Sequence, residues 1–264
     1  MKSTRSILKS LARGEISVER AEKELHGRLL EKIGDMAVID TGRQDRKGVP
    51  EVILAETKAD EDLPSIATSM VAANGFALLT RVSRKQAALL TDAFKGKKTK
   101  TRVTGRGDHL TVLIHQDEWS FPKPIASIAV ISAGTSDIPY ACEVEAIAEV
   151  MGVRPIVFND VGVAGMHRLV EPLKRIQEEN VAAIVVLAGM EGALPTVVAS
   201  LVSVPVIGLP VPTGYGFGGK GETALASMLQ SCALGLAVVN IGNGVGAGAF
   251  AALIARTCAS GREK

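Results

Sequence analysis

The sequence has few aromatic residues, few cysteines and almost no net charge. Its 264 residues include one Trp, two Tyr and six Phe, and 30 Lys and Arg nearly balance 28 Asp and Glu. The formal charge of +2 gives no general attraction for nucleic acid or for an anionic membrane surface, so neither is expected as a partner. Any ligand must therefore be bound at a local site.

The small number of cysteines excludes further classes of protein. Cys142, Cys232 and Cys258 form no Cys-x-x-Cys pair and are too few for a disulfide scaffold. Residues 1–15 also lack the apolar core of a signal peptide. Together these absences predict a reducing, cytoplasmic setting.

One stretch, residues 223–255, carries no formal charge and is longer than the roughly 20 apolar residues of a membrane-spanning helix. It is interrupted by Gln230, Asn240, Asn243 and five glycines. We therefore interpret it as a helix, a buried strand and a second helix, with a membrane segment as the less favoured alternative.

Hydrophobic residues make up 47% of the chain, which excludes a disordered protein and is enough for one large core or two small ones.

The charged residues are unevenly distributed between the two halves of the chain. Residues 1–125 contain 22 Lys and Arg and 17 Asp and Glu, whereas residues 126–264 contain 8 and 11. With Pro122 and Pro124 at the transition, this predicts a small α/β domain at 1–125 and a second domain at 126–264.

Within the first domain, helices are expected at residues 6–12 and from Ser17, the second with Ala21, Leu25 and Leu29 on one face. Ser83 with Gln86 three residues later has the capping-box signature of another helix. Further elements are expected as a helix at 65–73 and strands at 51–55, 76–82 and 111–115. The lysine-rich run 95–102 is interpreted as a solvated turn, with contact to phosphates as the alternative.

The second domain has a more regular pattern. Apolar runs of strand length at 126–132, 155–158, 182–187, 204–208 and 237–241 alternate with helical stretches. This alternation is typical of a parallel sheet that is covered by helices on both faces. Because ligands of such sheets bind beyond the carboxyl ends of the strands, the strand-to-helix loops are the candidate site.

The first two of these loops combine glycines with polar side chains. Residues 133–137, Ala-Gly-Thr-Ser-Asp, place hydroxyls and glycine at a helix start, which suits a phosphate or a carboxylate. The alternative is that Ser136 or Asp137 only caps the helix. The second loop contains Asp160 and His167. Taken alone, a histidine such as His167 is more often a surface or capping residue than a catalytic one.

The next two loops are stronger candidates for chemistry. Glu191 brings a carboxylate into the uncharged segment 188–195, as a general base or ligand-orienting group or merely as a helix cap. Residues 210–222 contain five glycines and Lys220, which could close over a phosphate although they match no Walker or dinucleotide fingerprint. Cys232 is expected in the helix that follows, and its spacing alone favours an inert buried thiol.

Taken together, six segments resemble the LarB family in order and spacing: AGTSD, DVGVAGMHR, AGMEGALP, PVPTGYGFGG, SCA and NIGNG. Members of that family are pyridinium-3,5-biscarboxylic acid mononucleotide synthases, which begin synthesis of the nickel-pincer nucleotide cofactor. Residues 48–53 and 79–83 look like the family's N-terminal domain. Gly242 stands where the family usually has aspartate, and Lys220 has no counterpart in its glycine-rich loop.

The C-terminal half is also similar to N5-carboxyaminoimidazole ribonucleotide mutase, a carboxylase of purine biosynthesis. This similarity implies a flavodoxin-like three-layer α/β/α domain and a homo-octamer. Ala193 occupies the position of the histidine that carries the proton in the purine enzyme, so the LarB resemblance is favoured. The mutase activity and a nucleotide-binding module without chemistry are the alternatives.

The resemblance implies that nicotinic acid adenine dinucleotide is carboxylated by CO2 at pyridine C5 and then hydrolysed to release AMP. Cys232 would add to pyridine C4, Glu191 would be the base and Ser136 would hold a carboxylate. Mg²⁺ is expected to assist, without a tightly bound organic cofactor. The substrate-binding residues would be Gly134, Thr135, Asp137, Asp160, His167, Gly189, Met190, Pro210, Thr213, Gly214, Tyr215, Gly219 and Lys220.

Overall fold

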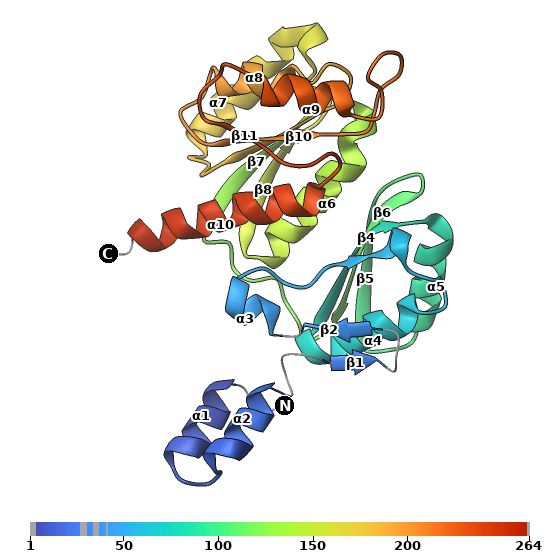
Figure 1. The fold of residues 1–264 in the computed structure, drawn as a ribbon, viewed down its shortest axis with the longest axis vertical. Helices are drawn as coiled ribbons and strands as arrows, with labels where there is room; N and C mark the ends of the chain where they lie inside the picture. The colour runs from blue at the N-terminus through green and yellow to red at the C-terminus, as the bar shows by residue number, and fades with distance from the viewer. Residues whose placement is uncertain (1–3, 27–30, 34–36, 41, 263–264) are drawn as a thin grey trace.

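Two β-sheets lie on opposite sides of helix α6 (Ile138–Val150) in the computed structural model, which describes residues 4–26, 31–33, 37–40 and 42–262 (Figure 1). Buried residues of both sheets and of α6 form one hydrophobic cluster, which includes Leu78, Leu113, Val130 and Ile147. The two halves of the chain therefore share a core through α6.

The C-terminal half has the expected flavodoxin-like arrangement. Its strands are β7 (Ala126–Ser132), β8 (Val153–Phe158), β9 (Ile184–Ala188), β10 (Val206–Pro210) and β11 (Leu236–Val238). All pair in parallel, in the spatial order β11-β10-β9-β7-β8. Every residue of β9 and β10 is buried, which explains why these strands are continuous apolar runs in the sequence.

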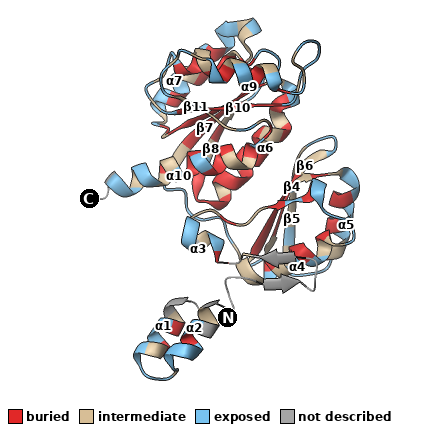
Figure 2. Ribbon diagram, in the orientation of Figure 1, coloured by how far each residue is buried: buried red, intermediate tan, exposed pale blue. Residues whose placement is uncertain are grey.

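Helices cover both faces of this parallel sheet, and Figure 2 shows that the buried residues concentrate between the layers. Helix α6 and helix α10 (Gly244–Arg262) pack on one face. The other face is covered by α7 (Val170–Glu178), α8 (Leu194–Ala199) and α9 (Glu222–Leu229). Residues 223–255 thus form a helix, a strand and a helix as predicted. The strand, β11, is not buried as expected, because it lies at the edge of the sheet and Ala237 is exposed. No helix in the described parts of the chain is long and apolar enough to cross a membrane.

Helices α6 and α10 are in close contact at two glycines. A Cβ atom at Gly248 would lie 2.4 Å from Ile147 Cγ2, and one at Gly244 would lie 2.5 Å from Glu143 Oε2. Real side chains do not make contacts this short, so glycine is required at both positions. The glycines at the start of α10 are therefore a packing requirement of the helix pair.

The N-terminal half is built around a mixed sheet with the spatial order β3-β4-β6-β5. Its strands are β3 (Ile53–Leu54), β4 (Phe76–Val82), β5 (Thr99–Arg106) and β6 (His109–Gln116). Helices α4 (Leu63–Asn74) and α5 (Arg84–Phe94) pack on one face, and the other face packs against α6. The predicted capping box at α5 is present, because Ser83 Oγ accepts from Gln86 N at 3.2 Å and Gln86 Oε1 accepts from Ser83 N at 3.0 Å.

Shorter elements complete the described chain. They are α1 (Thr4–Ala12), α2 (Val18–His26), β1 (Glu31–Ile33), β2 (Ala37–Ile39), α3 (Arg43–Lys47) and the 3-10 helices η1 (Ala55–Thr57), η2 (Thr135–Asp137) and η3 (Val163–Leu169). Both helices predicted near the N-terminus are therefore present. Leu29, predicted on the apolar face of the second, lies outside the described residues.

Three further local predictions are wrong. The lysine-rich run is a turn only as far as Lys98, because β5 begins at Thr99 and pairs with β6 along its whole length. The strand predicted at 51–55 is reduced to β3, since the chain enters the helical turn η1 at Ala55. The helix predicted to contain Cys232 ends at Leu229, and Cys232 is in the loop before β11.

Glu145, half-buried on α6, has its pKa raised to about 7, first by burial and then by the charge of Glu149. In an unfolded chain this carboxyl titrates near 4.5, so the folded protein holds the proton more tightly. The resulting stabilisation is complete below about pH 4.5 and is lost as the pH rises through about 7.

We expect Glu145→Gln, which resembles the protonated carboxyl, to raise the free energy of unfolding by about 1–2 kcal/mol at about pH 8 and to leave it unchanged near pH 4. Denaturant unfolding of both proteins at the two pH values measures this difference. An equal effect in acid and in base would contradict the assignment.

Candidate functional site

The loops that follow four parallel strands meet at the carboxyl edge of the sheet, as expected from the topology. They line an open cavity of about 350 Å³. The predicted residues that line it are Gly134, Ser136, Asp137, Gly189, Met190, Glu191, Thr213, Gly214 and Tyr215. The first, third and fourth predicted loops therefore contribute to one cavity. The second loop also contributes to it, through residues that were not among the predicted site residues, namely Gly162, Val163 and Ala164.

Asp137 links two of these loops at the cavity wall. Its side chain is only 3% exposed, its Oδ2 accepts from Gly134 N at 2.8 Å and its Oδ1 accepts from the Thr213 hydroxyl at 2.9 Å. Burial raises the pKa of Asp137 above its ordinary value, and these hydrogen bonds oppose the rise. Both carboxylate oxygens are thus already engaged in holding the loops together.

The third and fourth loops are in backbone contact. Met190 N donates to the Thr213 carbonyl at 2.9 Å, and a Cβ atom at Gly189 would lie 2.1 Å from the same carbonyl oxygen. Glycine is therefore required at Gly189 for the loops to approach each other. The sequence signalled this site by its glycine content, but it did not show which glycine makes the contact.

Two of the three predicted catalytic residues, Glu191 and Ser136, are exposed on the cavity wall. No hydrogen-bond or ion-pair partner of the Glu191 carboxylate lies among the residues that the structure describes. It is thus available to accept a proton from a ligand or to bind a polar group. Alanine at position 193 also lines the cavity, so no histidine side chain enters from that position.

The other predicted binding residues lie around the cavity rather than in its lining. Gly219 lines an adjoining hollow of about 180 Å³, together with Glu191 and Tyr215, and Lys220 is exposed next to it. Asp160 is paired with Arg168, whose Nη1 lies 3.1 Å from Asp160 Oδ2. The remaining ones outside the lining are Thr135 and His167, which are exposed, and Pro210, which is buried at the end of β10.

Cys232, the third predicted catalytic residue, does not line the cavity of its own chain. It is exposed in the loop between α9 and β11, so the expectation of a buried thiol in a helix is wrong. The preceding Ser231 hydroxyl is held there, because it accepts from Thr196 Oγ1 at 2.9 Å and from Ala233 N at 3.1 Å. The structure thus separates the predicted nucleophile from the predicted base within one chain.

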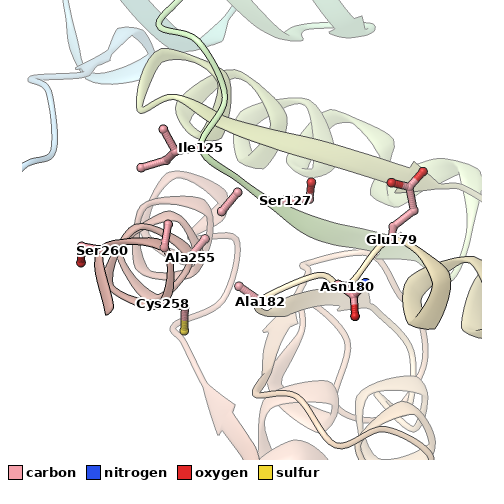
Figure 3. A pocket seen from close by; sticks show the side chains of 10 residues that line it. Ile125, Ser127, Glu179, Asn180, Ala182, Ala255, Cys258 and Ser260 are labelled. Carbon is pink, nitrogen blue, oxygen red and sulfur yellow. The ribbon is translucent and has the colours of Figure 1, made fainter. Parts of the chain in front are cut away.

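A second hollow, of about 530 Å³, lies near the amino ends of β7 and β9 and beside the last turns of α10 (Figure 3). Ile125, Ser127, Ala182 and Cys258 are among the residues that line it. None of the predicted site residues is there. The carboxyl edge of the sheet is therefore the better candidate site.

Two family models match the chain. One, described as AIR carboxylase, matches residues 127–263, and the other, described as LarB/PurE-like N-terminal domain, matches residues 30–104. The chain is 41% identical over 255 residues to the uncharacterized protein MJ0165 of Methanocaldococcus jannaschii, covering 97% of this chain and 98% of that protein.

Two N5-carboxyaminoimidazole ribonucleotide mutases are also similar. The Aquifex aeolicus protein is 33% identical over 137 residues, which are 50% of this chain and 77% of that protein. The Thermotoga maritima protein is 30% identical over 132 residues, which are 48% of this chain and 73% of that protein. The similarity to the mutases therefore extends over about half of the chain.

Thr213→Val tests the link between the loops, because it removes the hydroxyl that donates to Asp137 and keeps the shape of the side chain. We expect a loss of about 1–3 kcal/mol in the free energy of unfolding at neutral pH, since a buried carboxylate oxygen loses its donor. The loss should be smaller in acid, where Asp137 is protonated. Thr223→Val is the matched control because its hydroxyl makes only a 3.4 Å bond to the Phe217 carbonyl, and equal losses in both variants would contradict the role of Thr213.

Proposed function

Because the chain belongs to the LarB family, with a LarB/PurE-like N-terminal domain and an AIR carboxylase region, we propose that it is a carboxylase that acts on nicotinic acid adenine dinucleotide. It would add CO2 to pyridine C5 and then hydrolyse the phosphoanhydride, which gives pyridinium-3,5-biscarboxylic acid mononucleotide and AMP. The observation that carries the proposal is the Glu191 carboxylate, which lines the cavity and has no hydrogen-bond or ion-pair partner among the described residues. Ala193, in the same cavity, stands at the position of the proton-carrying histidine of the purine enzyme.

The proposed reaction needs a nucleophile and a base. The pyridinium ring is electron-poor, so C5 can attack CO2 only after the Cys232 thiolate adds to C4 and converts the ring to a dienamine. C5 then forms the bond to CO2, Glu191 takes the C5 proton, and the electron pair of that C–H bond restores the aromatic ring as the C4–S bond breaks. Water then cleaves the phosphoanhydride to release AMP.

Binding would use the groups that surround the cavity. Ser136 and the amides at the start of η2 are proposed to hold a carboxylate of the pyridine, because helix starts attract anions. Gly214, Gly219 and Lys220 of the glycine-rich loop are proposed to hold the diphosphate. Asp160 and His167, at the next loop, are proposed to orient the ribose or a phosphate.

Cys232 is exposed and does not line the cavity of its own chain, which supports a site that a second copy of the chain completes. The leucines on both sides of this cysteine are exposed, Leu229 by 66% and Leu234 by 93%, and so are the aromatic side chains at the cavity rim, Tyr215 by 84% and Phe217 by 100%. These exposed apolar side chains support a contact surface between copies of the chain. We propose that a homo-oligomer, an octamer by the family resemblance, brings Cys232 of one copy to the cavity of another.

Magnesium, which the resemblance implies, does not fit a dedicated site among the described residues. No group of three or more His, Cys, Asp or Glu side chains that could hold a metal ion is found in the described parts of the chain. In the cavity both oxygens of Asp137 are engaged, and among the described lining residues Glu191 has the other carboxylate. No step of the proposed reaction is therefore assigned to the metal.

The first test combines the purified protein with nicotinic acid adenine dinucleotide and ¹³C-bicarbonate, with and without Mg²⁺, and follows products by mass spectrometry. We expect a labelled dicarboxylated mononucleotide and AMP from the unaltered protein and from Cys258→Ala, which removes another exposed thiol. Cys232→Ala should form neither product. Full turnover by Cys232→Ala would overturn the thiolate mechanism.

The mutases provide the second candidate function, since two of them match the C-terminal half. Turnover of carboxyaminoimidazole ribonucleotide that does not depend on Cys232 would support that function. Recovery of both nucleotides unchanged, with saturable binding, would instead indicate a nucleotide-binding module without chemistry.

The shared site has its own test, in which Cys232→Ala and Glu191→Gln are co-expressed. Each variant alone should be inactive, because every site lacks either the thiolate or the base. In mixed oligomers about a quarter of the sites would combine an intact Cys232 with an intact Glu191 from another copy, so about a quarter of the activity should return. Absence of any recovery would contradict a site formed between copies.

A further inference from the structure

Strand β4 of the N-terminal domain contains an irregularity that directs one arginine toward the C-terminal half. Its pairing with β6 shifts register between Leu79 and Val82. Arg81, within this irregularity, has a φ of +54°, a left-handed conformation that is unfavourable for a residue with a side chain. Such bulges redirect side chains, and they are frequent beside functional sites.

The Arg81 guanidinium connects three segments of the chain. Its Nη1 donates to Glu56 Oε1 at 2.5 Å within the N-terminal domain, and its Nη2 donates to the Gly242 carbonyl at 2.7 Å in the turn before α10. Its Nε lies 3.6 Å from Glu143 Oε1 on α6. One planar side chain thus fixes the N-terminal domain, α6 and the Gly242 turn relative to one another.

The acidic partner on α6 is buried and has a second contact from the N-terminal domain. Glu143 is 1% exposed, and its Oε1 lies 2.7 Å from His109 Nε2. The His109 ring packs edge-on against Tyr140, with 4.4 Å between ring centroids. The Arg81 contact is therefore part of a well-packed cluster between the two halves of the chain.

The Gly242 turn also contacts the segment that forms the cavity wall. Gly242 N donates to the Pro210 carbonyl at 2.8 Å, and a Cβ atom at Gly242 would lie 3.7 Å from Pro212 Cδ. The same segment continues to Thr213, which bonds Asp137 across the cavity. A continuous set of contacts thus leads from Arg81 to the residues that line the candidate site.

We propose that Arg81 is a positioning residue through which the N-terminal domain holds the Gly242 turn, and with it the wall formed by residues 210–213, in the shape that binds the nucleotide. The identity of the nucleotide rests on the proposed function, whereas the mechanical link does not. A second ion pair, Arg102 with Glu149 of α6, also joins the two halves of the chain. Among the described residues the hydrogen bond to the Gly242 carbonyl comes from Arg81 and not from this pair.

The test uses the matched variants Arg81→Lys and Arg102→Lys in the full chain. Lysine keeps a positive charge beside each glutamate, but a single ammonium group cannot hold Glu56, Glu143 and the Gly242 carbonyl together. Amide hydrogen exchange of peptides that cover residues 189–192, 210–214 and 240–246 should be faster in Arg81→Lys and unchanged in Arg102→Lys. This readout does not depend on any activity, so it tests the link even if the proposed function fails.

Kinetics with nicotinic acid adenine dinucleotide test the consequence for the site. Arg81→Lys should raise KM about tenfold and change kcat by less than about threefold, whereas Arg102→Lys should leave both within about twofold. Arg81→Met, which removes the charge as well, should give the same pattern more strongly. Equal exchange rates in the two lysine variants, or an equal change in KM, would show that Arg81 only joins the domains and would overturn the proposal.

Discussion

The structure depends on one helix that is buried on two sides. Helix α6 lies between the parallel sheet and the N-terminal sheet, and its residues Ala141, Val144, Ala146, Ile147, Ala148 and Val150 are all shielded from water. A helix in this position is only weakly amphipathic, because little of its surface faces solvent and only a few side chains, such as Glu145 and Glu149, are partly exposed. Its first turn follows directly from the loop that contains Ser136 and Asp137, so the packing of the two halves and the shape of the cavity are set by the same element.

This arrangement explains why the charged residues between the two halves matter more than their number suggests. Arg81 and His109 contact Glu143 where water is largely absent. Removal of one partner of a buried charge there would destabilise the fold strongly, because the charge would be left unpaired. Surface ion pairs of the same chain, such as Lys174 with Glu178, are well exposed and contribute little. The relation of the N-terminal domain to the cavity is therefore specified by a few buried polar contacts within a large apolar surface.

Much of the fold could be predicted from the sequence, because buried parallel strands and capped helices have local signatures. The uninterrupted apolar run of β9 and the capping box at Ser83 are both present as expected. Strand β5 could not be predicted in this way, since its polar residues lie at a sheet edge where hydrogen bonding to β6 outweighs composition. Local pattern also could not show that α9 ends before Cys232, because the chain turns there to enter β11.

The candidate site was predicted as a set of loops more reliably than as a set of residues. Topology alone brings the loops after parallel strands to one edge. A single carboxylate in an uncharged segment singled out Glu191, and Glu191 lines the cavity. The engagement of Asp137 by Thr213 depends on residues 76 positions apart, which no local pattern reveals. For the same reason the separation of Cys232 from the cavity became visible only in three dimensions.

The two glycines where α10 meets α6 limit how this protein can change over evolutionary time. With no room for a methyl group beside Ile147 or Glu143, substitutions at Gly244 and Gly248 cannot be accommodated singly and would need simultaneous replacements on the facing helix. Single substitutions are therefore largely excluded at the contact between α6 and α10, whereas the exposed loops beside it can vary. New substrate preferences in descendants of this chain would be expected to arise by changes in those loops, on a helix pair that stays the same.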